Sequence, residues 1–296
     1  MSNSYAEILR RHAKQMLPIA TGAEPVLRKL SNIRAVLFDV YGTLLISGSG
    51  EVGTVGRAAC EPALAEAFRA VGLTMSAPAA QGMRCFYETI EASHVASQAA
   101  GIEYPEVDIV EIWRKVLAEL RRRDVVEGPA DAAVDPARLA VEYEARANPC
   151  WPMPQMQKCL VQLHDASILL GIVSNAQFYT PELFVALLEK SAETLGFDPQ
   201  LAYYSYRQGR AKPGAAMYRQ AVETLRARQI AADEALYVGN DMLNDILPAR
   251  ELGFHTALFA GDRRSLRWRE DDRRVAAVVP DLVLTDLGQL PQCVVQ

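Results

Sequence analysis

A short run of apolar residues, Ala35-Val36-Leu37-Phe38, stops abruptly at Asp39, and the next run of this kind begins only near Ser167. Such a run before a polar loop is typical of a strand buried in a parallel sheet. The residues in between, from about 57 to 147, carry apolar side chains at helical spacing and show no strand alternation. Helices are predicted there over 62–71, 81–100 and 107–123. The first strand is therefore separated from the rest of its sheet by an inserted helical segment.

Beyond this segment, predicted strands and helices alternate along the chain. The strands cover 167–173, 201–206, 235–238, 255–259 and 282–284, and the helices cover 181–195, 214–228 and 245–252. This order produces a parallel sheet with helices on both faces. The sequence therefore predicts a doubly wound, Rossmann-like α/β core that is interrupted by an all-helical insertion.

The length of 296 residues fits two domains or one core with a large insertion, and the pattern favours the second. The predicted parts are an N-terminal extension of two short helices in 1–32, a core in 33–53 and 150–296, and a helical insertion, or cap, in 54–149.

The two connections of the cap are predicted hinges, near 47–53 and near 149–154. Three prolines in the second connection oppose regular structure there. Gly48, Gly50 and Gly53 in the first connection spell the GxGxxG pattern of dinucleotide-binding loops. Because the preceding strand already ends at Asp39, we interpret these glycines as hinge residues rather than as a phosphate loop.

The composition excludes several classes of protein. The net charge of −5, from 31 Lys+Arg against 36 Asp+Glu, argues against a protein that binds nucleic-acid backbones. The longest stretch without a charged residue, Ala166 to Pro181, is shorter than the roughly 20 residues of a membrane span, and no signal peptide is visible. The five cysteines form no CxxC pair, so we expect a cytoplasmic protein without disulfides or structural zinc.

Polar residues follow the predicted strands of the core, at the sheet edge where ligands of such folds bind. They are Asp39 and Tyr41, Ser174 and Asn175, Lys212, and Asn240, Asp241 and Asp245. An aspartate can act as a nucleophile that forms an ester, a lysine stabilises developing negative charge, and carboxylates bind magnesium. These residue types predict a site that handles a small anionic substrate.

The same residues resemble the four motifs of the haloacid dehalogenase superfamily, in order. The motifs are Asp39-Val40-Tyr41-Gly42-Thr43, Ser174-Asn175, Lys212-Pro213 and 239–245. The long interval between the first two is what a helical cap of the C1 type would produce. The resemblance implies a hydrolase in which Asp39 attacks the substrate, forms an ester-like intermediate and is released by water.

For the phosphatase branch of the superfamily, the resemblance also implies a set of ligands for Mg²⁺. These would be Asp39, the main-chain carbonyl of Tyr41 and Asp241, with Asp245 as outer support or second ligand. Thr43, Ser174 and Asn175 would bind the transferred group, and Lys212 would hold Asp39 and neutralise charge. On the cap, Arg84 shares a helical face with Tyr87, Glu91 and His94, and it would contact a substrate anion if that face is turned toward Asp39.

Two departures from the family pattern point in opposite directions. Tyr41 stands where the phosphatase branch usually has a second Asp, and a phenol is a poor general base at neutral pH. Tyrosine here is similar to the branch that hydrolyses 2-haloalkanoic acids, whose halide leaves without a proton. Asp241 favours a metal site instead, because a second carboxylate near Asp39 would otherwise repel an anionic substrate.

Three functions therefore remain open from the sequence. We place a Mg²⁺-dependent phosphatase of a small phosphorylated metabolite first, a 2-haloacid dehalogenase second, and a ligand-binding protein without efficient catalysis third.

The arginine-rich segment 263–274, which also carries Glu270, Asp271 and Asp272, is interpreted as an ion-paired surface. The oligomeric state is left open.

Overall fold

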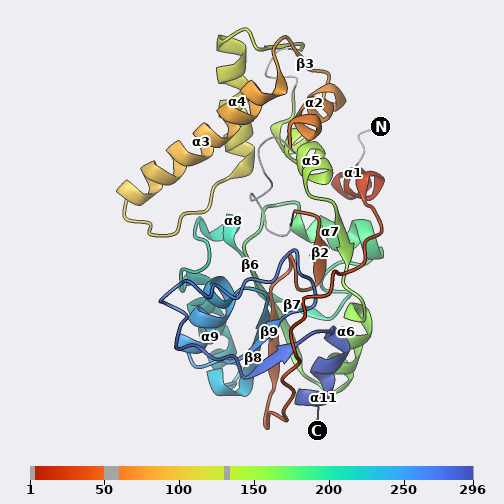
Figure 1. Ribbon diagram of the computed structural model, residues 1–296, viewed down its shortest axis with the longest axis vertical. Coiled ribbons are helices and arrows are strands. Elements are labelled where there is room, and N and C mark those ends of the chain that lie inside the picture. The colour runs from red at the N-terminus through yellow and green to blue at the C-terminus, as the bar shows by residue number, and fades with distance from the viewer. Residues whose placement is uncertain (1–3, 50–59, 130–133, 296) are drawn as a thin grey trace.

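The computed structural model describes residues 4–49, 60–129 and 134–295. Two lobes lie along its long axis, an α/β core and a mainly helical cap (Figure 1). Within the described residues, no helix combines the length and the apolar character that crossing a membrane requires.

The core contains a six-stranded sheet in the order β10-β9-β8-β1-β6-β7. All neighbouring strands in it run parallel. The bounds are β1 Ala35–Phe38, β6 Leu169–Ser174, β7 Phe197–Tyr204, β8 Ala235–Gly239, β9 His255–Phe259 and β10 Leu282–Leu284. The predicted doubly wound sheet is therefore confirmed, and the strand predicted first lies at its centre.

Helices cover both faces of this sheet because alternate side chains of each strand point to opposite faces. On β1, Val36 and Phe38 belong to the apolar cluster that includes helix α6, Met156–Asp165, whereas Ala35 and Leu37 belong to the cluster that includes helix α9, Ala216–Ala227. The core helices are α6 Met156–Asp165, α7 Thr180–Leu188, α8 Ser205–Gln208, α9 Ala216–Ala227, α10 Leu247–Glu251 and α11 Leu290–Val294. Short helical turns cover Ala232–Glu234, Met242–Ile246 and Leu287–Gln289.

The cap consists of α2 Glu61–Ala70, α3 Ala79–Ala99, α4 Ile109–Arg122 and α5 Pro136–Ala147. Its core is aromatic: the ring of Trp113 stacks on Phe86 at 4.5 Å between ring centroids and meets Tyr143 edge to face at 5.2 Å. One feature differs from the predicted all-helical segment. The two-residue strands β3 Thr74–Met75 and β4 Val126–Glu127 form an antiparallel pair, which is too short to show as sequence alternation.

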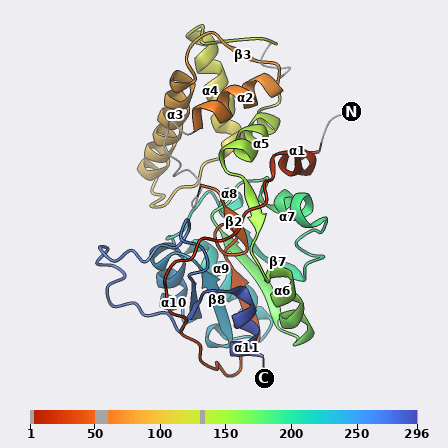
Figure 2. The same ribbon diagram turned by 45° about the vertical axis from the view of Figure 1, so that its right-hand side comes forward.

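The connection between the lobes is a small antiparallel sheet of β2 Leu45–Ser47 and β5 Cys150–Pro152 (Figure 2). The prediction of irregular structure in the second hinge was therefore wrong for these residues. The prolines are compatible with this pairing although they have no N–H to donate. Pro149 accepts a hydrogen bond from Gly48 through its carbonyl, and the N–H of Met153 donates to Leu44. Residues 50–53 of the first predicted hinge lie outside the described part of the chain, as does the boundary at 53–54, and the division into core and cap at these connections remains our proposal.

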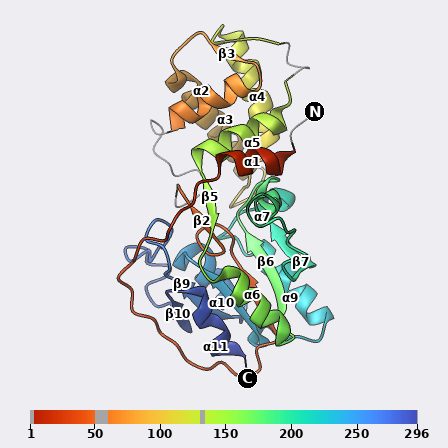
Figure 3. The same cartoon turned by 90° about the vertical axis from the view of Figure 1, so that its right-hand side faces the viewer.

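Within its described residues, 4–32, the N-terminal extension contains one helix instead of the predicted two. Helix α1, Tyr5–His12, begins with a capping box formed by Ser4 and Glu7 and contacts both α5 of the cap and α7 of the core (Figure 3). The second predicted helix is absent from the described residues. Val26 there makes an antiparallel bridge with Val283 instead, so the segment extends along the sheet edge. The apolar spacing of Val26, Leu27 and Leu30 predicted a helix, but these residues lie in an extended segment that contacts the sheet edge through Val26.

Candidate active site

The strand order brings the predicted polar residues together. Strands β8, β1 and β6 are neighbours, so Asp39, which follows β1, lies beside Ser174 at the end of β6 and Asn240 after β8. Asp39 is 6% exposed, and it lines a cavity of about 90 Å³ at the carboxyl edge of the sheet. The cavity walls also include Tyr41, Asn175, Lys212, Asn240, Asp241, Asn244, Asp245, Ser265 and Arg267.

The carboxylate of Asp39 is held by one of its two oxygens. Its Oδ1 accepts hydrogen bonds from Ser174 Oγ at 2.8 Å and from Lys212 Nζ at 2.7 Å. Within the described residues, Oδ2 accepts no hydrogen bond from the protein. One oxygen is therefore fixed and charge-compensated, while the other is available to a molecule in the cavity.

Lys212 links Asp39 to a second buried carboxylate. Its Nζ donates to Asp245 Oδ1 at 2.5 Å and to the hydroxyl of Tyr237 at 3.2 Å. Burial lowers the pKa of Lys212, but Asp245 and Asp39 more than offset it, so that this pKa lies above its usual value. The ammonium group is therefore charged throughout the neutral range.

Asp245 acts on this site through Lys212. Its Oδ2 accepts the backbone N–H groups of Asn240 and Asp241, at 2.9 and 3.0 Å, and its Oδ1 accepts from Lys212 and Tyr237. Burial raises the pKa of Asp245 to about 6, which Lys212 only partly offsets. With four donors already directed at it, Asp245 is better described as a positioning residue for Lys212 than as a metal ligand.

Asp241 forms an ion pair that the sequence did not predict. Arg269 donates from Nη2 to Oδ2 at 2.5 Å and from Nε to Oδ1 at 3.1 Å, which is a bidentate pair. The carboxylate also accepts the N–H groups of Leu243 and Asn244 and the side-chain amide of Asn244. The interpretation of 263–274 as a surface of ion pairs was therefore wrong for Arg269, whose guanidinium reaches the candidate site.

These contacts allow a test of whether the residues fit a magnesium ion. Mg²⁺ requires oxygen ligands in near-octahedral geometry, supplied by carboxylates whose lone pairs face the ion. Both oxygens of Asp241 already accept hydrogen bonds from protein donors, the Arg269 guanidinium among them, whereas Oδ2 of Asp39 accepts none within the described residues. As arranged, the Arg269 guanidinium provides the positive charge beside Asp241, so Asp241 would have to exchange this partner before it could serve as the predicted Mg²⁺ ligand.

Tyr41 cannot replace the general base of the phosphatase branch. Its hydroxyl forms a hydrogen bond with Thr180 Oγ1 at 2.9 Å. Burial raises the pKa of Tyr41 well above its usual value, and the nearby carboxylates act in the same direction. The phenol is therefore neutral at all ordinary pH values and has no basic oxygen to offer.

The remaining predicted residues divide into two groups. Thr43 donates to Asn240 Oδ1 at 3.3 Å, and Asn175 Oδ1 accepts the N–H of Lys212 at 2.7 Å, so both support the loops around Asp39. Arg84 is exposed on α3 and lines neither this cavity nor the one in the cap. The structure thus brings together all the predicted core residues but not the arginine predicted on the cap.

Ser265, Arg267 and Arg269 are site residues that the sequence reasoning missed. They lie in the long loop after β9, which is joined to the fourth motif by backbone hydrogen bonds between Arg267 and both Asn240 and Met242. The available signal was their position after a predicted strand, at the same sheet edge as Asp39. Their dense charge pattern concealed it, because alternating charges are also typical of a surface.

Comparisons with known proteins identify the family. A model of haloacid dehalogenase-like hydrolases matches residues 33–253. The chain belongs to this family and is a hydrolase, as the four motifs predicted.

Individual relatives are distant. The chain is 25% identical over 245 residues to the Rhythmically expressed gene 2 protein of Drosophila melanogaster. The matched region covers 78% of this chain and 85% of that protein. It is 28% identical over 142 residues to the ribulose-1,5-bisphosphate 5-phosphatase of Halopiger xanaduensis, covering 48% of this chain and 56% of that protein. The crystal structure of 2-haloacid dehalogenase from Pseudomonas syringae pv. Tomato DC3000 matches with a TM-score of 0.56 at 22% identity, covering 88% and 97% of the two chains. At this identity the structural match confirms the fold alone.

Proposed function

We propose that this hydrolase attacks a saturated carbon of a small anionic substrate through Asp39 and works without a divalent metal, as a 2-haloacid dehalogenase does. The observation that carries the proposal is the bidentate pair between Arg269 and Asp241. This pair supplies by protein contacts the charge compensation for which the metal was invoked. It also removes the objection that an unpaired Asp241 would repel an anionic substrate.

In the first step, Asp39 Oδ2 attacks the carbon that carries the leaving group. A bond forms between that oxygen and the carbon, and the bond from carbon to halogen breaks, so that its electron pair departs with the halide. Halide needs no proton, which is consistent with a neutral Tyr41 in the cavity wall. Lys212, Arg267 and Arg269 offset the negative charges of Asp39, Asp241 and Asp245 around the cavity, so an anionic substrate would not meet a net negative wall.

In the second step, water hydrolyses the ester on Asp39. The water oxygen adds to Cγ, and negative charge develops on Oδ1, where Lys212 Nζ and Ser174 Oγ already donate hydrogen bonds. Donors placed in advance at a developing oxyanion are a large source of rate enhancement. When the intermediate collapses, the substrate oxygen leaves as an alcohol with one proton from the water, the other proton goes to solvent, and Asp39 is regenerated as a carboxylate.

A Mg²⁺-dependent phosphatase is the second candidate. Asp241 lines the same cavity as Asp39, which is the placement that a shared metal ion would need. For this reading to hold, Arg269 would have to release Asp241 before the ion could bind. Phosphate release would also have to proceed without a general base at position 41. Tyr41→Asp would supply one, so this substitution should raise phosphate release in a phosphatase but not in a dehalogenase.

The test is a panel of 2-haloacids beside a panel of phosphate monoesters, each with Mg²⁺ and with EDTA. We expect halide release at the same rate in both conditions, and phosphate release near background. Arg269→Gln removes the guanidinium that pairs with Asp241, so this variant should gain a rise in melting temperature with added Mg²⁺ that the unaltered protein lacks. Strict Mg²⁺ dependence of any turnover would contradict the proposal, and a folded protein that releases neither product would favour the non-catalytic alternative.

A further inference from the structure

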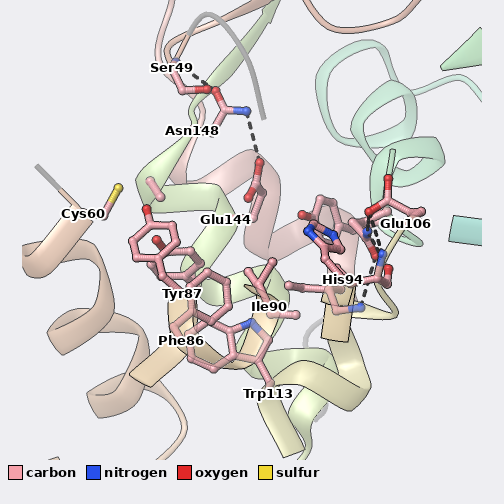
Figure 4. A pocket seen from close by; sticks show the side chains of 17 residues that line it. Ser49, Cys60, Phe86, Tyr87, Ile90, His94, Glu106, Trp113, Glu144 and Asn148 are labelled. Carbon is pink, nitrogen blue, oxygen red and sulfur yellow. Dashed lines mark hydrogen bonds between the residues drawn. The ribbon is translucent and has the colours of Figure 1, made fainter. Parts of the chain in front are cut away.

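The cavity in the cap, where it meets the core, belongs to the site already described. It has a volume of about 320 Å³, and its walls come mainly from α3, α4 and α5 and from the core loop after β6 (Figure 4). Tyr179 in this loop directly precedes Thr180, the hydrogen-bond partner of Tyr41 in the cavity at Asp39. The N-terminal segment 16–21 is also connected to this site, through the loop after β9.

The N-terminal segment 16–21 is bound to the core by polar contacts. The N–H of Ile19 donates to Asp262 Oδ1 at 3.2 Å, and the carbonyl of Ile19 accepts from the N–H of Arg263 at 2.9 Å. Leu17 and Ile19 are 74% and 39% exposed, so the burial of their apolar surface contributes little to holding the segment. Its position therefore depends mainly on hydrogen bonds and charge.

A buried ion pair organises these contacts. The side chain of Asp262 is 0% exposed, and its Oδ2 accepts from Arg264 Nε at 3.0 Å and from Arg264 Nη2 at 2.9 Å. Arg264 Nη2 also donates to the carbonyl of Leu17 at 2.5 Å. Each member of the pair thus binds the backbone of the N-terminal segment, Asp262 at Ile19 and Arg264 at Leu17. Buried ion pairs add little net stability, but they can fix a single arrangement of the segments they join.

The loop after β9 continues from this pair to the fourth motif. A turn is closed by the hydrogen bond from the N–H of Leu266 to the carbonyl of Asp262, at 3.0 Å. The backbone bonds of Arg267 with the fourth motif follow, and then the bidentate pair of Arg269. The loop is therefore held at its start by segment 16–21 and at its end by the fourth motif.

We propose that the ion pair of Asp262 and Arg264, with the N-terminal segment 16–21 that it binds, positions Arg269 for its contact with Asp241. Neither member of the pair lines the catalytic cavity, so both act through Arg269. The effect on turnover rests on the function proposed above, in which Arg269 compensates Asp241 beside an anionic substrate. When the ion pair is lost, Arg269 is held less well, the charge of Asp241 is less compensated, and the anion binds more weakly.

Hydrogen exchange followed by mass spectrometry tests whether the segment holds the loop, and it needs no substrate. Asp262→Asn keeps the shape of the side chain but removes its charge. We expect the peptides that contain Arg267 and Met242, whose amides join the loop to the fourth motif, to exchange about tenfold faster in this variant. Thr21→Val removes the hydroxyl that donates to the carbonyl of Ala260 at 2.9 Å, and it should act in the same direction with a smaller effect. This second variant decides if Asp262→Asn does not fold.

The control is Arg28→Gln. Arg28 belongs to the same N-terminal extension, but its ion pair with Asp281 lies outside segment 16–21. Its loss should leave the exchange of both peptides unchanged. Unchanged exchange in both Asp262→Asn and Thr21→Val would overturn the inference, whatever reaction the protein catalyses. An equal acceleration in the control would also overturn it, because any change in the extension would then act alike.

A double-mutant cycle tests the role of the pair in turnover. Asp262→Asn should raise KM for the best substrate about three- to tenfold and change kcat by less than about twofold, because the anion is repelled equally in the ground state and the transition state. In the Arg269→Gln background, the same substitution should change KM by less than about twofold, since no guanidinium remains to be positioned. Equal increases in the two backgrounds would contradict action through Arg269. If the unaltered protein shows no turnover, the proposed function fails, and the exchange comparison still decides whether the segment holds the loop.

Discussion

Asp39→Asn should lower turnover by about four orders of magnitude or more, because a nucleophile cannot be replaced by its neighbours. The amide has nearly the shape of the carboxylate, and its oxygen can still accept from Lys212 and Ser174, which now hold Asp39 Oδ1. What is lost is the charged oxygen that attacks the substrate. Initial rates with the best substrate of the two panels measure the effect.

The control for this variant is Asp165→Asn, an exposed aspartate at the end of α6. It should retain full activity, and both variants should melt close to the unaltered protein. If Asp39→Asn kept more than a few per cent of the rate, Asp39 would not be the nucleophile, and the ester mechanism would have to be abandoned for either branch of the family.

Lys212→Gln should lower both activity and stability. Lys212 is 6% exposed, and its Nζ compensates Asp39 and Asp245 at once. Removing one partner of a buried charge cluster typically costs about 3–5 kcal/mol in the free energy of unfolding. The loss of a donor to Asp39 Oδ1 should also reduce turnover by about 10²–10³. Urea unfolding and initial rates measure the two effects, and Lys158→Gln, exposed on α6, is the control.

The stability loss in this variant should depend on pH. Without Lys212, which lowers the pKa of Asp245, this pKa should lie further above its value in the unfolded chain, so the folded variant binds more protons than its unfolded chain. Its stability therefore recovers as the pH falls. The difference from the unaltered protein should be largest above the pKa of Asp245, about 6 with Lys212 in place, and smaller below it. A difference that is small and constant with pH would show that Lys212 does not hold this pair together.

The sequence predicted the sheet and most of the site because both depend on local patterns. Buried strands show as apolar runs, and in a parallel sheet the residues after such runs share one edge. This was enough to place Asp39, Ser174, Lys212 and Asp245 together before the strand order was known. The aromatic and apolar spacing of 107–123 likewise predicted α4, because that helix buries one continuous face.

The features that were missed depend on contacts between distant segments. Strands β2 and β5 are three residues long, so they carry no measurable period, and their pairing is set by the two ends of the cap meeting. Arg269 belongs to a long loop whose path no residue pattern specifies, yet its pair with Asp241 changes the interpretation of the site. The choice between metal and guanidinium was therefore out of reach for sequence reasoning, which treated Asp241 as a carboxylate without a partner.

The most direct test of the central claim is a single turnover in H₂¹⁸O with the protein in excess over substrate. If an ester forms on Asp39, the product oxygen comes from the carboxylate and the water oxygen enters Asp39. We expect mass spectrometry to find an unlabelled product and one ¹⁸O atom in the peptide that contains Asp39, at the same level with EDTA as with Mg²⁺. Label in the product and none in that peptide would contradict the account.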